Sequence, residues 1–250
     1  MNRATAAIAL LVISATVASC GDGDDGGSSL IVSAASSLEP AFAAYAERAG
    51  IDARQSFAGS DELAAQIRQG VTPDVYPAAN TTLPDQLHAD GLVEKPVVFA
   101  SNSLVLAVPA GSEISALKDL GRPGITIAIG DSGVPIGTYT REVLERLPSS
   151  ESDAILANVR SEEPEVSGIV GKLTQGAVDA GFVYATDVAA AEVELEAIAL
   201  PARLQPDVAY GAAVVVGADH SAEARAFIDG LLAGPGAEAL EEAGFKPPPR

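Results

Sequence analysis

The sequence predicts an α/β fold with mainly parallel sheets. Short runs rich in Val and Ile alternate with stretches whose apolar residues follow a helical period. About 220 residues follow position 29, enough for two lobes of roughly 100 residues, each with its own core. Alternation of this kind is typical of sheets flanked by helices. The predicted strands are residues 30–34, 74–78, 104–109, 125–129, 179–184 and 210–216, and the predicted helices include residues 38–49, 61–69 and 138–147.

The first 19 residues predict an export signal. Arg3 precedes an apolar run, residues 4–17, that is too short to span a bilayer. The run ends in small residues before Cys20, the only cysteine, in a pattern that resembles the lipobox of bacterial lipoproteins. A lipid on Cys20 would anchor the chain to the outer face of the cytoplasmic membrane; an ordinary signal peptide followed by a stray thiol is the alternative. Residues 20–29, rich in Gly and Asp, are predicted to be a flexible tether.

The composition is strongly acidic, with a formal net charge of −19 and a pI of about 4.3. This charge and the lack of a basic block exclude nucleic acid as a plausible partner. They also disfavour long-range attraction of an anion. An anionic ligand would therefore have to be held by directed hydrogen bonds in a local site.

Four predicted strand-to-helix turns carry residues suited to such a site, because ligands of α/β sheets bind beyond the carboxyl ends of the strands. Ser37 and Ser60 lie in two of these turns, and Pro135 and Pro164 lie in the other two. Helix N-termini present free N–H groups and a partial positive charge. Taken singly, each serine is more simply explained as the cap of its own helix.

Seven segments, in order, resemble the molybdate-binding proteins of bacterial ABC transporters, from about Leu30 to Phe245. The shortest is Glu165-Val166. The other six are VSAASSL at 32–38, SFAGS at 56–60 followed by Leu63 and Gln66-Ile67, PDVY at 73–76, NSLV at 102–105, GDSGVPIGTY at 130–139 and DAGFVYATD at 179–187.

The resemblance implies a two-lobed type II periplasmic-binding fold with the ligand in a cleft between the lobes. It implies lobe one at residues 30–101 plus 208–250, lobe two at 102–207, and a hinge at 102–106 and 206–211. The partners would be an ABC permease and the membrane, and the protein would be a monomer. No cofactor, free metal ion or enzymatic activity is expected.

In that family the oxyanion, molybdate or tungstate, is held by two serine hydroxyls, two backbone amides and a tyrosine hydroxyl. The matching residues here are Ser37, Ser60, Ile136, Val166 and Tyr184. All are neutral donors, and such donors favour a fully deprotonated tetrahedral oxyanion. Without the resemblance, Tyr184 reads equally well as a core residue. Another oxyanion or small solute, or a sensor role for the same fold, stays open.

Two acidic features depart from the family pattern. Asp61 follows Ser60 directly, and it is expected in the first turn of a helix, facing water. Glu162, Glu163 and Glu165 surround Pro164 and are expected in a solvated loop that could instead face the permease. Contact of Asp61 or Glu165 with the ligand is the alternative.

A serine hydrolase is the rival from another functional class, since residues 130–133 match the tetrapeptide around the nucleophile of chymotrypsin-like proteases. Ser132 would need a histidine base. His88 is predicted within a helix and His220 at the start of a surface helix, away from the proposed cleft. Asp22, Asp24 and Asp25 superficially suggest calcium, but no closing glutamate follows at the required spacing.

Overall fold

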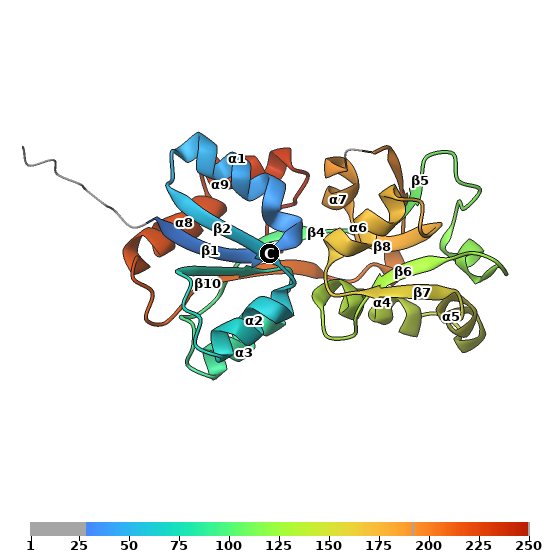
Figure 1. Ribbon diagram of the computed structural model, residues 1–250, viewed down its shortest axis with the longest axis horizontal. Coiled ribbons are helices and arrows are strands. Elements are labelled where there is room, and N and C mark those ends of the chain that lie inside the picture. Colours follow the sequence, from blue (N-terminus) through green and yellow to red (C-terminus); the bar gives the residue numbers. More distant parts are fainter. Residues whose placement is uncertain (1–28, 192, 250) are drawn as a thin grey trace, which may run out of the picture.

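A computed structural model describes residues 29–191 and 193–249, which form two lobes joined side by side (Figure 1). Each lobe is built on one five-stranded sheet. The predicted signal peptide, Cys20 and nearly all of the predicted tether lie outside the described residues. In the described part of the chain, no helix has the length and apolar character needed to cross a membrane.

The first lobe has the strand order β2-β1-β3-β10-β4. Helices α1, α8 and α9 pack together on one side of the sheet, and α2 and α3 pair on the other (Figure 1). The strands are β1 Leu30–Ala35, β2 Ala53–Ala58, β3 Val75–Ala78, β4 Val97–Asn102 and β10 Val208–Val214. The helices are α1 Glu39–Ala49, α2 Ser60–Arg68, α3 Thr82–Ala89, α8 Ser221–Leu232 and α9 Pro235–Glu242, with a 3-10 turn at Ser36–Leu38.

The second lobe has the strand order β7-β6-β8-β5-β9. Its strands are β5 Leu104–Pro109, β6 Ile127–Gly130, β7 Val159–Glu163, β8 Ala180–Tyr184 and β9 Leu195–Ala199. Its helices are α4 Pro135–Glu145, α5 Ser149–Leu156, α6 Val166–Thr174 and α7 Ala185–Ala190, with 3-10 turns at Leu117–Gly121 and Ala202–Leu204.

Each of the six predicted strands overlaps an observed strand, but the sheets are mixed rather than mainly parallel. In the first lobe β1 pairs in parallel with β2 and β3, whereas β10 runs antiparallel to β3 and β4. In the second lobe β6 pairs in parallel with β7 and β8, whereas β5 runs antiparallel to β8 and β9. The antiparallel strands β5 and β10 are those that the chain enters on passing from one lobe to the other.

Three strands that are absent from the predicted set, β4, β7 and β9, lie at sheet edges. Strand β7 has the sequence VRSEE, and β9 has the sequence LEAIA with exposed positions along its length. An edge strand needs little apolar surface, and charged residues on it discourage pairing with other chains. Hydrophobic patterning therefore gives no clear signal for these two strands.

A buried carboxylate, Asp74, ties the first lobe together at the start of β3. One oxygen accepts the backbone N–H of Ile31 at 2.7 Å and lies 3.0 Å from Nδ1 of His220. The other accepts the backbone N–H of His220 at 2.9 Å. Burial acts to raise the pKa of Asp74, but these hydrogen bonds outweigh it and hold the pKa below the usual value. His220 stands at the start of α8, as predicted, and it is also part of this anchor.

Replacing Asp74 by Ala is expected to lower the free energy of unfolding by about 3 kcal/mol, because two buried backbone N–H groups lose their acceptor. Urea denaturation followed by circular dichroism measures this change. Asp90→Ala is the control, since Asp90 is an exposed partner of Arg68 and its loss should cost about 0.5 kcal/mol or less. Equal effects of the two substitutions would contradict the anchoring role.

Candidate functional site

One cavity between the lobes is lined by all five residues that the sequence analysis selected. Ser37 follows β1, Ser60 follows β2, Ile136 follows β6, Val166 follows β7, and Tyr184 ends β8. These strands belong to the parallel parts of the two sheets, whose carboxyl ends meet at this point. The cavity is therefore built from strand-to-helix turns of both lobes.

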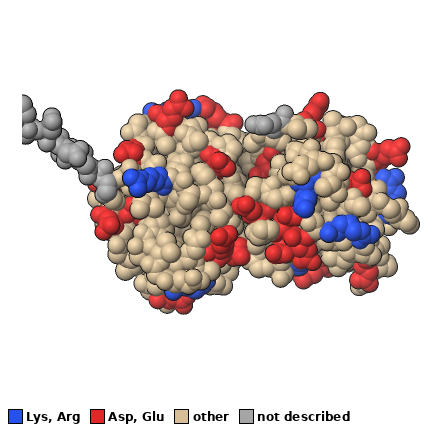
Figure 2. All heavy atoms as spheres, in the orientation of Figure 1, with Lys and Arg blue, Asp and Glu red and all other residues tan. Residues whose placement is uncertain are grey.

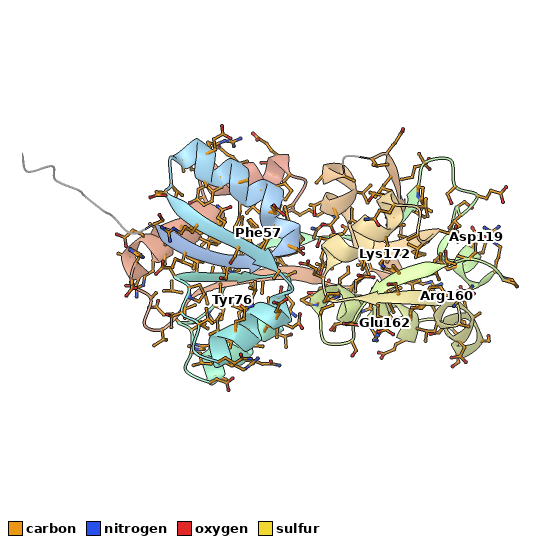
Figure 3. The ribbon with its side chains drawn as sticks, in the orientation of Figure 1. Phe57, Tyr76, Asp119, Arg160, Glu162 and Lys172 are labelled. Atoms are coloured by element: carbon orange, nitrogen blue, oxygen red, sulfur yellow. The ribbon has the colours of Figure 1, made fainter. Side chains whose placement is uncertain are left out.

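Ser60 is the first residue of α2, and its side chain does not cap that helix. Its hydroxyl oxygen instead accepts the backbone N–H of Ala79, at 3.1 Å. Its carbonyl oxygen accepts the hydroxyl of Tyr76, at 2.6 Å, and Tyr76 lies among the strands of the first lobe (Figure 3). Since Ala79 N–H occupies only the acceptor side of the Ser60 hydroxyl, its proton remains available to a ligand.

Ser37 lies in the 3-10 turn after β1, which also has no side-chain cap. Its hydroxyl is 3.0 Å from the hydroxyl of Tyr210 on β10. The simple explanation that each serine caps its own helix is therefore wrong for both. Each hydroxyl is positioned by a bond to another element.

Ile136 and Val166 contribute backbone N–H groups from the first turns of α4 and α6. N–H groups in the first turn of a helix have no partner within that helix. Helix α4 begins at Pro135, three residues earlier than predicted, so Ile136 lies in the helix rather than before it. The start of α4 packs so closely on the preceding loop that a Cβ atom on Gly137 would lie 1.8 Å from the carbonyl oxygen of Asp131. Only glycine fits there.

Tyr184 has a hydroxyl group without a hydrogen-bond partner among the described residues, and that oxygen is buried. The residue is 1% exposed, and its ring contacts those of Tyr139 and Tyr210 edge-on. Burial raises the pKa of Tyr184 well above its usual value, so the hydroxyl keeps its proton. A tyrosine that served only as a core residue would ordinarily keep its hydroxyl paired. Here the unpaired donor borders the cavity.

Two carboxyl oxygens near the cavity are also buried without a hydrogen-bond partner, one on Asp61 and one on Glu165. Glu165 lines the cavity and precedes α6. Asp61 lies in the first turn of α2, as predicted, but its Oδ1 atom is buried rather than facing water. The neighbouring Glu162 and Glu163 belong to strand β7, so the prediction of a solvated loop over residues 162–165 was wrong.

The two lobes touch at Gly59 and Pro164. A Cβ atom on Gly59 would lie 2.6 Å from the carbonyl oxygen of Pro164 and 3.0 Å from Oδ1 of Asp61. Gly59 therefore permits a close backbone approach that no other residue would allow in this arrangement.

The residues that line the cavity include no Lys, Arg or His. Acidic side chains gather around the junction of the lobes on the face shown in Figure 2. Two neighbouring acids are paired: Glu162 with Arg141 at 2.9 Å, and Glu163 with Lys172 at 3.8 Å, all in the second lobe, where Figure 3 labels Glu162 and Lys172. The cavity offers an anion neutral donors only.

The hydrolase alternative for Ser132 finds no support in this geometry. His88 contacts the carbonyl oxygen of Val93, and His220 contacts Asp74, both in the first lobe. Ser132 lies in the second lobe, between β6 and α4. Within residues 29–191 and 193–249, moreover, no cluster of three or more His, Cys, Asp or Glu residues could hold a metal ion.

Residues 30–246 match the family described as bacterial extracellular solute-binding protein. The chain belongs to this family. One relative of this solute-binding protein is the molybdate-binding protein ModA of Mycobacterium tuberculosis, which is 32% identical over 231 residues, covering 89% of this chain and 86% of the relative. The resemblance to the molybdate-binding proteins of bacterial ABC transporters is thereby confirmed.

Solved structures share the fold of this solute-binding protein. The periplasmic molybdate-binding protein of Azotobacter vinelandii superimposes with a TM-score of 0.78 at 23% identity, over 88% of this chain and all of that one. The sulfate-binding protein SubI of Mycobacterium tuberculosis gives the same TM-score at 17% identity, over 88% of this chain and 86% of that one. The predicted two-lobed type II periplasmic-binding fold is confirmed, and the fold alone does not distinguish between ligands.

Proposed function

We propose that this solute-binding protein captures molybdate, and also tungstate, for an ABC importer. The observation that carries the proposal is the buried, unpartnered hydroxyl of Tyr184 at a cavity lined by neutral donors from both lobes. A buried donor without a partner costs about 1–3 kcal/mol, and an oxyanion would remove that cost. The relative described as a molybdate-binding protein supports the choice of oxyanion.

In the proposed complex the hydroxyls of Ser37, Ser60 and Tyr184 and the amides of Ile136 and Val166 donate to the oxygens of the anion. Hydrogen bonds to a charged acceptor are roughly twice as strong as neutral ones, so five neutral donors can hold a dianion without a cation. The helix N-termini at Ile136 and Val166 add positive potential. A proton on the ligand would face a donor, which disfavours protonated oxyanions.

The proposed lobes are residues 30–101 with 208–250, and 102–207. We propose that they close on the ligand about the crossing segments 102–106 and 206–211, as hinged domains do. The close approach of Gly59 to the carbonyl of Pro164 supports a closed arrangement of the described structure. The closed form would present the permease with a surface that the open form lacks.

The proposed location is extracytoplasmic, with the chain held at the membrane by a lipid on Cys20. The sequence of residues 1–20 supports this, as does membership of a family of extracellular solute-binding proteins. We propose that the protein acts as a monomer and delivers its ligand to a membrane permease.

Calorimetric titration of the chain from Ser28 onward is the first test, because the described residues 29–191 and 193–249 hold both lobes. Molybdate and tungstate should each bind tightly with one-to-one stoichiometry, and sulfate should bind at least tenfold more weakly. Sulfate is smaller, so its oxygens would lie farther from the donors, and hydrogen bonds weaken with length. Equal affinity for sulfate would contradict the proposed choice of molybdate as the ligand. No heat with any of the three anions would contradict the proposal that the cavity binds an oxyanion.

Tyr184→Phe and Ser60→Ala should each weaken molybdate binding by about 10- to 100-fold, corresponding to the loss of one hydrogen bond to a charged group, about 1.5–3 kcal/mol. Tyr45→Phe is the matched control, because its hydroxyl donates to the carbonyl of Phe227 inside the first lobe. If both site variants bound molybdate as tightly as the parent, the assignment of Tyr184 and Ser60 as ligand donors would be wrong.

Gly59→Ala should hinder closure, because the added Cβ atom would lie 2.6 Å from the carbonyl of Pro164. With molybdate at saturation, small-angle X-ray scattering should give a larger radius of gyration for this variant than for the parent, together with at least tenfold weaker binding. Gly133→Ala is the control, since a Cβ atom there would meet nothing within 4 Å. A compact, tightly binding Gly59→Ala variant would argue against the closure proposed here.

A further inference from the structure

A third carboxyl group, that of Asp187, lies directly behind the oxyanion site. Its Oδ2 atom accepts the backbone N–H of Tyr184 at 2.8 Å. Asp187 also borders a second cavity between the lobes, which Ser37 lines as well. Ser37 and Tyr184 both line the oxyanion cavity, so Asp187 bonds one residue of that cavity and shares the second cavity with another.

No cation neutralises Asp187. None of the ion pairs among the described residues includes it. Glu242, across the second cavity, pairs with Arg48. Lys172, on α6, pairs with Glu163. Strands β5 and β8, which also contact α7, carry no Lys, Arg, Asp or Glu.

A further cation, outside these ion pairs, is Lys246, whose ammonium donates to the hydroxyl of Ser103, the residue whose carbonyl accepts the N–H of Ala185 in α7. The other titratable groups near Asp187 are acidic or neutral. Glu196 on β9 accepts the N–H of Gly111. Burial and the negative charge of Asp187 both raise the pKa of the Tyr184 and Tyr210 phenols. On the cavity side stand Glu165 and Asp61, each with a buried oxygen that has no partner. A negative charge on Asp187 thus has hydrogen-bond support from Tyr184 N–H but no opposite charge.

Burial raises the pKa of Asp187 to about 7, against the smaller opposing effect of the hydrogen bond from Tyr184. The carboxyl group is therefore poised between its two forms near neutral pH. Asp187 is half-buried and lies beside the second cavity. Negative charge added close to it shifts this balance toward the neutral form.

We propose that oxyanion binding is coupled to uptake of one proton by Asp187, which acts as a positioning residue through its bond to Tyr184. The inference rests on the proposed function and deepens it. The proton comes from solvent and goes to Oδ1, while Oδ2 continues to accept the N–H of Tyr184. The ligand is held through its oxygens by the five donors, and Asp187 makes no bond to the metal atom.

The sign of the pH dependence follows from this coupling. Well below pH 7 the carboxyl group is already neutral in the free protein, and the affinity is highest. As pH rises through about 7, a proton must be taken up on binding, so the affinity falls by at most about tenfold per pH unit for one proton. Molybdate itself stays a dianion over this range.

Calorimetric titration of the parent with molybdate at pH 7, in PIPES and in imidazole, measures proton uptake, because the two buffers release different heats when they give up a proton. The parent should take up a fraction of a proton, and its affinity should fall between pH 6 and pH 8. Asp187→Asn keeps an acceptor for Tyr184 N–H and carries no charge. It should bind as the parent does at pH 6, with no proton uptake and no change up to pH 8.

Glu242→Gln is the control variant and should retain the proton uptake of the parent. Glu165→Gln tests the carboxyl group that lines the oxyanion cavity, and proton uptake should persist in it if Asp187 is the group that takes up the proton. Tight binding by the parent with the same heat in both buffers would overturn this inference alone. Uptake that persists in Asp187→Asn, or that disappears only in Glu165→Gln, would overturn the assignment to Asp187. Loss of binding in Asp187→Asn at every pH would also contradict it. Absence of binding by the parent would overturn the proposed function and this inference with it.

Discussion

A phenol hydroxyl buried without a hydrogen-bond partner is a constraint that the surrounding structure must accommodate, and Tyr184 imposes it where the two lobes meet. Its ring packs between Tyr139 in the second lobe and Tyr210 in the first. The hydroxyl therefore cannot turn away to find another partner without breaking the packing of both. Around it the protein arranges further neutral donors from strand-to-helix turns. A cavity of this kind is incomplete until an acceptor enters it.

Anion binding by a chain of net charge −19 requires that attraction be local. The donors proposed for this task are two hydroxyls held by Tyr210 and Ala79 and two amides at helix N-termini, and each is positioned without a ligand. The nearby carboxyl groups of Asp61 and Glu165 oppose this attraction. They make a negative ligand less favourable unless protons or donors compensate, which gives the site a means of discrimination beyond size.

The junction between the lobes is itself a bonded structure. Ser37 bonds Tyr210 across the first lobe, and Asn102, at the end of β4, donates to Thr186 at 2.9 Å in the second lobe. Tyr184 and Tyr210 pack edge-on across the same boundary, with ring centroids 5.8 Å apart. Residues that hold the ligand donors are therefore also residues that hold the lobes together, so ligand contact and lobe arrangement share the same side chains.

The sequence by itself determined the alternation of strands and helices and the turns that carry Ser37 and Ser60, because these are properties of local pattern and spacing. Its resemblance to the molybdate-binding proteins indicated the family. Edge strands such as β7 gave no signal, since an exposed strand needs no apolar face. Only the tertiary structure decided that neither serine caps its helix, that Asp61 and Glu165 have buried oxygens, and that Asp187 lies behind Tyr184. Burial and hydrogen-bond partnership depend on which distant segments meet, and no local pattern records that.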